Sequence, residues 1–293
     1  MQACAILSLP IHADDAASKQ TCASPPTIIQ SVRVFDGKDI IPEATIMIRC
    51  ALIERVIEGS DIANLPTEGV LIDGRGRFLM PGLIDSHTHT FRREFLQRSL
   101  EFGVTTAFDM GSLASGFKLA IDAEDVEGQA DDRADLLSAV VWVTAPGSHG
   151  TQFGESPTLE SPDKADAFIA QRVADGADFI KIIYDNFKMF DADIPTLKRE
   201  TMAATVDAAH ARGMIAVVHS RDVEAWADVV EAGVDGIVHL PVDDVPDPVL
   251  INLLKEKGIW VGGNLSLTRP LGKSLLEDPV IAPMLTEPEK ERL

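Results

Sequence analysis

"PGLIDSHTHT", residues 81–90, marks the point at which the pattern of this 293-residue chain changes. Before it, short runs of alternating apolar and polar residues are separated by Gly, Asp and Pro, which is typical of strands joined by tight turns. After it, short apolar runs alternate with longer amphipathic segments, which indicates βα units and a parallel sheet. We therefore predict a small β domain over residues 27–80 and an α/β domain over residues 81–293.

The α/β domain contains seven segments with the composition of strands. They are residues 82–89, 104–110, 138–144, 178–184, 214–220, 235–240 and 259–264. The amphipathic segments 161–177, 194–213 and 220–234 carry Gly or Ala near their ends, as helices do before the next strand. A closed (β/α)8 barrel of the TIM type has eight strands. The fold class predicted is therefore a TIM-type barrel of which this chain supplies seven strands.

The composition excludes several classes of function. Lys and Arg number 26 against 46 Asp and Glu, and the formal net charge of -20 repels phosphate backbones and anionic lipids. No apolar window reaches the ~18 residues that a membrane span requires. We therefore expect neither a nucleic-acid partner nor a membrane partner.

The cysteines and the N-terminal residues give weaker indications. Cys4, Cys22 and Cys50 have no paired spacing, so we expect neither a disulfide framework nor a thiolate zinc site. Any metal would then be bound by nitrogen and oxygen. Residues 1–26 are a candidate export signal or disordered leader, but they lack a basic start. Periplasmic or secreted and cytoplasmic locations all stay open.

Four of the seven histidines lie at the ends of predicted strands: His87, His89, His219 and His239. Chemistry in a TIM-type barrel takes place at the C-terminal ends of the strands, so we expect these imidazoles to meet at one rim. His87 and His89 are two residues apart, so an extended strand points both to the same side. An H-x-H pair alone is weak evidence of a metal, and each histidine alone is as well explained as a hydrogen-bonded core residue.

Lys181 strengthens the metal hypothesis. It interrupts the apolar run "FIKIIY", and a lysine is almost never buried in a strand without a partner. Burial favours the neutral amine, which can react with carbon dioxide to give a carbamate whose two oxygens could bridge two cations. The alternative is a lysine whose stem packs in the barrel while its ammonium reaches solvent. Imidazole and carbamate ligands without thiolate suit zinc best.

Five segments resemble the metal-dependent amidohydrolase superfamily, in the branch of imidazolonepropionase-like and Xaa-Pro dipeptidase-like enzymes. They are "VFDGKDIIPEATIMIR", "LIDGRGRFLMPGLIDSHTH", "FGVTTAFDMG", "DFIKIIYD" and "EAGVDGIVHLP". The resemblance covers residues 27–268 and implies a (β/α)8 barrel with a small β-sandwich formed by both chain ends. A departure from the family is Cys50-Ala51, where relatives tend to have a polar residue and Gly in a tight turn.

The resemblance also implies a binuclear metal site. His87 and His89 would bind the first ion, a carboxylated Lys181 would bridge both ions, and His219 and His239 would bind the second. Two divalent ions, most consistent with zinc, would acidify a shared water as the nucleophile and polarise the scissile carbonyl.

The family's acid/base aspartate ends the eighth strand, and it has no counterpart in this sequence. We expect its position to lie beyond Leu293, so no catalytic residue is assigned within the chain. Asp109 and Asp243 end or follow strands, but neither matches that position, and residues 277–293 are predicted to be a loop and a charged helix. The chain is therefore expected to be a fragment of a longer reading frame or a natural truncation. An open barrel would expose strand edges that another copy of the chain could cover.

The reaction that the resemblance implies is hydrolysis of a carbon–nitrogen bond in a small amide, cyclic amide or peptide. His149 lies in a loop similar to the family's Gly-Gly-His-Gly segment, with Ser148 in place of one Gly, and either contacts the substrate or is only solvated. Tyr184 and Arg221 follow ligand-bearing strands and either reach the substrate or make ordinary packing and ion-pair contacts. His210, late in a predicted helix, is given no chemical role.

Three other functions remain open. They are an Xaa-Pro-like metallo-dipeptidase, an esterase or lactonase, and a catalytically silent metal-binding fragment. The silent alternative follows from the missing aspartate, and the fold alone cannot decide between them.

Overall fold

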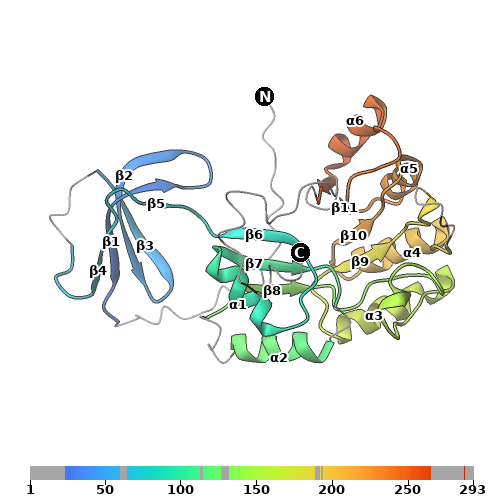
Figure 1. Cartoon of the computed structure of the whole chain (residues 1–293), viewed down its shortest axis with the longest axis horizontal. Coiled ribbons are helices and arrows are strands. Elements are labelled where there is room, and N and C mark those ends of the chain that lie inside the picture. Colours follow the sequence, from blue (N-terminus) through green and yellow to red (C-terminus); the bar gives the residue numbers. More distant parts are fainter. Residues whose placement is uncertain are drawn as a thin grey trace. The chain divides into compact units, whose positions relative to one another are not determined.

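The computed structural model describes residues 24–59, 65–112, 115–126, 132–188, 192, 194–264 and 287. The chain divides into two compact units between Pro81 and Gly82 (Figure 1). The predicted leader lies almost entirely outside the described residues, and so does the charged helix predicted near the C-terminus. No helix in the described part is both long and apolar enough to cross a membrane.

The expectation about the family's aspartate also falls outside the described residues. It places that residue beyond Leu293, and Leu293 itself is not among the residues that the structure describes. The position of the aspartate therefore stays a prediction.

The N-terminal unit contains one mixed β-sheet. Its strands are β1 (Thr27–Phe35), β2 (Ile40–Arg49), β3 (Leu52–Glu58), β4 (Val70–Asp73) and β5 (Phe78–Leu79), in the order β3-β2-β1-β4 with β5 also paired to β1. β1, β2 and β3 are antiparallel neighbours, whereas β4 and β5 run parallel to β1. The tight turns predicted from the sequence therefore account for the antiparallel β1, β2 and β3, but not for β4 and β5, which pair in parallel with β1.

The turn between β2 and β3 has an unusual composition. Cys50 and Ala51 both have positive φ angles, 51° and 62°, as in the tight hairpin turns that Asn-Gly sequences usually form. Cys50 is disulfide-bonded, although the cysteine spacing gives no sign of a pairing. A single bond is not the disulfide framework that the sequence argues against.

The second unit is built from parallel strands. They are β6 (Leu83–Thr88), β7 (Val104–Asp109), β8 (Asp135–Ser138), β9 (Ile180–Ile183), β10 (Ala216–His219), β11 (Gly236–Val238) and β12 (Trp260–Gly262). They form two sheets, β6-β7-β8 and β9-β10-β11-β12, linked by a bridge between Val143 and Ile182. Among the described residues no strand pairs β12 with β6, so the described strands alone do not form a closed barrel.

In the part of the chain that the structure describes, helices with defined bounds accompany these strands. They are α1 (Arg93–Glu101), α2 (Ser115–Val126), α3 (Ala165–Ala174), α4 (Arg199–His210), α5 (Val223–Glu231) and α6 (Pro248–Lys257). Asp222 and Asp247 cap α5 and α6, each accepting a hydrogen bond of 2.7 Å from a backbone N–H in the first turn. The main core joins the apolar faces of α3, α4 and α5 to β9, β10 and β11. Each of these helices lies in the chain between two successive strands of the second unit (Figure 1).

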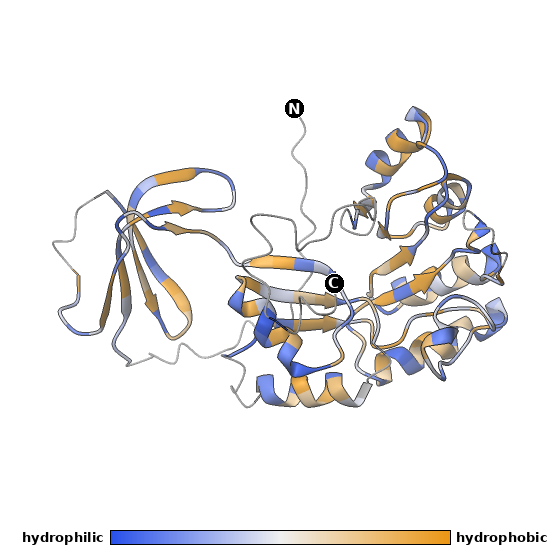
Figure 2. Cartoon of the chain, in the orientation of Figure 1, coloured by the Kyte–Doolittle hydropathy of each residue, from blue (hydrophilic) through white to orange (hydrophobic). Residues whose placement is uncertain are grey.

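The two edge strands of the second unit expose apolar side chains. Leu83 and Ile84 on β6 are exposed, and so are Trp260 and Val261 on β12. Figure 2 shows β6 changing from hydrophobic at its start to hydrophilic at its end, where the histidines lie. A second copy of the chain that would cover these edges stays a prediction.

The third predicted strand, residues 138–144, is displaced in the structure. β8 already ends at Ser138, because the β-branched Val140 has a positive φ of 56° and turns the chain. Val141 donates a backbone hydrogen bond of 2.6 Å to Ala139, and pairing resumes only at Val143. The apolar run in the sequence gives no sign of this bend.

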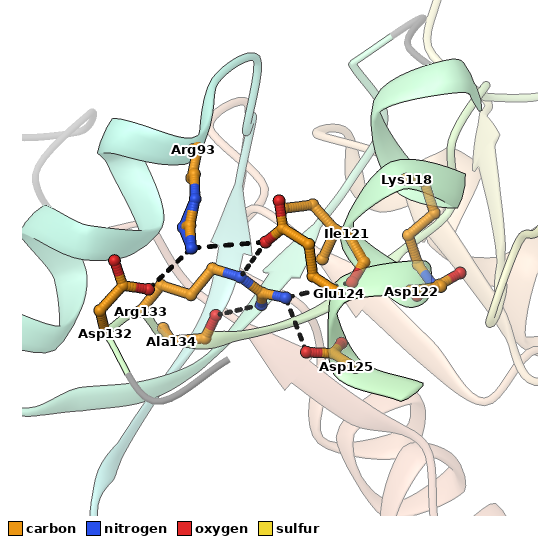
Figure 3. A network of polar contacts seen from close by, with 9 residues as sticks. All are labelled: Arg93, Lys118, Ile121, Asp122, Glu124, Asp125, Asp132, Arg133 and Ala134. Atoms are coloured by element: carbon orange, nitrogen blue, oxygen red, sulfur yellow. Dashed lines mark hydrogen bonds and ion pairs between the residues drawn. The ribbon is translucent and has the colours of Figure 1, made fainter. Parts of the chain in front are cut away.

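A buried arginine ties α2 to the segment before β8 (Figure 3). The Arg133 side chain is 0% exposed and pairs with Asp125 at 2.6 Å and Glu124 at 3.4 Å. Its guanidinium also donates to the carbonyl oxygens of Ile121 at 3.1 Å and Ala134 at 3.3 Å. The charge is thus matched by carboxylates, and its N–H groups by acceptors, so the burial is tolerated.

Replacing Arg133 with methionine is expected to lower the free energy of unfolding by about 2 kcal/mol, less than for fully buried pairs because its carboxylate partners are partly exposed. Chemical denaturation measures this loss. The matched control is Lys164→Met, which removes an exposed ion pair with Glu160 and is expected to cost under about 1 kcal/mol. Equal losses in the two variants would show that the buried Arg133 network contributes no more stability than an exposed ion pair.

Candidate metal centre

One cavity of about 810 Å³ is lined by all five residues that the resemblance predicts as metal ligands: His87, His89, Lys181, His219 and His239. Each lies in a strand or directly after one, on β6, β9, β10 and β11. The C-terminal ends of parallel strands meet at one edge, which explains why residues so far apart in the sequence are neighbours. The structure therefore brings the predicted set together.

The imidazoles form a continuous cluster. Ring centroids are 5.5 Å apart for His87 and His89, 4.9 Å for His87 and His239, and 4.4 Å for His219 and His239. His89 Nδ1 lies 2.7 Å from the Gly111 carbonyl, which can only accept, so Nδ1 is the donor in this contact, and in the neutral ring Nε2 is then the nitrogen without a proton. Such a backbone contact is the usual way a protein orients an imidazole for a metal.

The protonation states suit metal binding. Burial, followed by repulsion from Lys181, lowers the pKa of His87 to about 2 and that of His239 to about 4. Burial also holds the pKa of His219 well below its ordinary value. These imidazoles are therefore neutral at pH 7, and the neutral ring is the form that binds a metal.

Lys181 is 3% exposed, and its Nζ has no hydrogen-bond partner among the described residues. Burial lowers its pKa to about 7, so a large share of the amine is neutral at neutral pH. His87 Nδ1 is likewise buried without a partner. Two buried nitrogens without hydrogen-bond partners among the described residues, Lys181 Nζ and His87 Nδ1, fit a site for cations and a carbamate. Within the described ranges, however, no three His, Cys, Asp or Glu side chains already have the spacing of a formed metal site.

Asp185 was missed by the sequence reasoning. Its buried carboxylate accepts hydrogen bonds from His219 Nε2 at 3.1 Å and from Arg221 Nε at 2.7 Å. Burial alone would raise its pKa, but these two hydrogen bonds lower it to about 2. The ionised carboxylate therefore fixes the His219 proton on Nε2. Nδ1 is left without a proton and is the nitrogen that can bind a metal.

The remaining cavity wall is largely aromatic. Trp142, Phe153 and Phe187 line it together with His149 and Arg221. The His149 ring lies 4.7 Å from the Phe187 ring, and the Arg221 guanidinium lies 4.1 Å from the same ring. Burial lowers the pKa of His149. This part of the cavity wall thus places the Arg221 cation and the His149 imidazole beside an apolar surface.

Three other residues considered from the sequence lie elsewhere. The Tyr184 hydroxyl donates to Asp228 on α5 at 2.8 Å, and Tyr184 does not line the cavity. Asp243 accepts the Val223 backbone N–H at 3.1 Å, at the start of α5. Asp109 is buried in a hydrogen-bond network outside the lining. The described residues that line the cavity include no aspartate or glutamate.

Known proteins resemble this chain in sequence. A family model described as "Amidohydrolase family" matches residues 78–285. The uncharacterized protein Rv2915c of Mycobacterium tuberculosis (strain ATCC 25618 / H37Rv) is 25% identical over 191 residues, which cover 63% of this chain and 50% of that protein. The chain thus matches half the length of this curated relative.

Solved structures show the same architecture. An Xaa-Pro dipeptidase crystallised with bound methionine superposes with a TM-score of 0.70 at 23% identity, covering 91% of this chain and 72% of that chain. A putative prolidase from Bifidobacterium longum gives a TM-score of 0.63 at 26% identity, covering 79% and 57%. The fold is therefore of the TIM-barrel type with an N-terminal domain.

Proposed function

This chain belongs to the amidohydrolase family, and from that premise we propose that it is a metal-dependent hydrolase that cleaves a carbon–nitrogen bond of an amide or cyclic amide. The observation that carries the proposal is the cavity lined by four strand-end histidines and by Lys181, whose buried amine has no hydrogen-bond partner among the described residues. The barrel is proposed to be a (β/α)8 barrel whose first seven strands are β6–β12. Its eighth strand and the family's aspartate are not among the described residues.

The four histidines divide into two pairs, each of which would hold one ion. His87 and His89 would bind one divalent ion, His219 and His239 the other, and Lys181 would lie between them. Nitrogen and carbamate oxygen without thiolate favour zinc. When bound, two such ions would acidify a water molecule and polarise the scissile carbonyl.

Lys181 would become a ligand only after modification. Its neutral amine would attack the carbon of carbon dioxide, forming an N–C bond, and one amine proton would leave to solvent. The product carbamate carries one negative charge on two oxygens. The pKa of about 7 makes this step accessible at neutral pH, because the protonated ammonium has no lone pair for the attack.

The other side chains would bind and orient the substrate. Asp185 holds His219 and Arg221 in place, and Arg221 would attract a negative end of the substrate. His149, kept neutral by burial, can donate a hydrogen bond to a substrate oxygen. Trp142 and Phe153 would pack against an apolar group. N-acyl amino acids and dipeptides combine these features, and the likeness to a putative prolidase makes Xaa-Pro dipeptides the second candidate class.

The proposal is tested with purified chain and a panel of N-acyl amino acids, Xaa-Pro dipeptides and other dipeptides. We expect turnover of at least one substrate, loss of turnover after treatment with a chelator, and recovery on addition of zinc. Zinc bound with no turnover of any substrate would instead support the silent metal-binding alternative.

A further inference from the structure

A single carboxylate joins the ends of three neighbouring strands beside the cavity. Asp109, 1% exposed, accepts through Oδ1 from the backbone N–H of Thr90 at 3.1 Å and of Gly111 at 3.2 Å. Its Oδ2 accepts from the hydroxyls of Ser112 at 2.8 Å and Ser138 at 2.6 Å. Four donors match the roughly four acceptor positions of a carboxylate. Asp109 is therefore fully engaged.

Two of these contacts lie on either side of His89. Thr90, whose N–H Asp109 accepts, is the next residue in the chain. Gly111, the other backbone donor, presents the carbonyl that accepts the His89 Nδ1 proton at 2.7 Å. Asp109 thus fixes both the backbone that follows His89 and the acceptor that sets its tautomer. Only that tautomer leaves Nε2 unprotonated.

The remaining contacts hold the bend after β8. Ser138 Oγ, which donates to Asp109, accepts the Val140 N–H at 2.8 Å. Ser112 donates its backbone N–H to the Val140 carbonyl at 3.1 Å. The positive φ of Val140, 56°, is a strained conformation that persists only where the surroundings enforce it. The same network therefore positions the segment that leads into the cavity wall at Trp142.

A role as the missing acid/base does not suit Asp109. It does not line the cavity, and no acceptor position is left for a substrate or a water. Its contacts instead point to support of a neighbouring ligand.

We propose that Asp109 is a positioning residue, which holds the His89 ring in the orientation and tautomer that a metal requires. The proposal rests on the proposed function, since it takes His89 to be a ligand. It adds a residue from another strand to the site, and it explains why a buried carboxylate stands at the end of β7.

The test compares Asp109→Asn with wild type as metal-free proteins labelled with ¹⁵N-histidine. An amide can accept fewer of the four donors, so the Gly111 carbonyl loses its fixed place. We expect the His89 signal to change from a pure Nδ1–H tautomer to a mixture, and the zinc Kd to rise about 10- to 100-fold. Long-range proton–nitrogen spectra and zinc titration measure the two effects.

Asp178→Asn is the matched control, because Asp178 also accepts a backbone N–H, that of Ser138 at 2.8 Å, whereas the N–H groups of Thr90 and Gly111 on either side of the His89 contact donate to Asp109. It is expected to lower Tm and leave the His89 tautomer and the zinc Kd unchanged. An unchanged tautomer and Kd in Asp109→Asn, or equal changes in Asp178→Asn, would overturn the proposal.

Two further measurements keep the test decisive. If Asp109→Asn fails to fold, Ser112→Ala removes one of the four donors and is expected to shift both readouts in the same direction by less; no shift there counts against the proposal. If wild type binds no zinc, the proposed function fails, while the tautomer comparison still decides the role of Asp109.

Discussion

Replacing Lys181 with methionine is expected to reduce kcat/KM for amide hydrolysis by about a thousand-fold or more. Methionine has a similar length and no amine, so no carbamate can form and no ligand lies between the two histidine pairs. Bound ions contribute several kcal/mol of transition-state stabilisation, and each ~1.4 kcal/mol is a factor of ten in rate. Lys181 is 3% exposed and lies in the fully buried strand β9, so the variant is expected to fold with a Tm equal to or above that of wild type.

The control for Lys181→Met is Lys118→Met, because Lys118 is also buried but pairs with Asp122 at 2.5 Å and Asp178 at 3.1 Å. This control is expected to lose stability and to keep its activity per folded molecule. Retention of activity in Lys181→Met, or an equal loss in Lys118→Met, would contradict a chemical role for Lys181.

Asp185→Asn is expected to lower the free energy of unfolding by about 3 kcal/mol, the loss typical of removing the carboxylate from a largely buried ion pair. The pair in question is the one with Arg221, whose Nε is 2.7 Å from the carboxylate in the native protein. Denaturant titration of the metal-free protein measures the loss. A cost under about 1 kcal/mol would show that the interaction behaves like a surface ion pair.

The same carboxylate predicts a dependence of stability on pH. Its pKa in the folded protein is about 2, below the ordinary value of 3.8. A lowered pKa means that the ionised group stabilises the fold above the ordinary pKa, and that this contribution is lost as pH falls towards 2. The metal-free wild type should therefore lose more stability than Asp185→Asn between about pH 4 and pH 2. Parallel curves for the two proteins would contradict the assignment.

Much of the site could be predicted because its residues break an otherwise regular pattern. Lys181 is a charge inside an apolar run, and the histidines end apolar segments at the expected spacing. The contact geometry around them could not be predicted in the same way, since it depends on loops. The bend at Val140 is an example, because it does not change the hydrophobic pattern.

Side-chain alternation explains why the neighbouring residues Tyr184 and Asp185 have different surroundings. Lys181, Ile183 and Asp185 have the same parity along β9 and its extension, whereas Tyr184 has the opposite parity. Successive side chains of a strand point to opposite faces. Period two would thus have placed Asp185 on the side of Lys181 and Tyr184 on the helix side, where it contacts Asp228. The sequence therefore contains a signal for Asp185, which lies four residues after Lys181.

The central claim is that the strand-end histidines and Lys181 form one binuclear site. Its most direct test is the number of zinc ions bound per chain after equilibrium dialysis with zinc and bicarbonate, measured by elemental mass spectrometry on the folded wild-type protein. The account predicts two ions per chain. A folded protein that retains no zinc would contradict it.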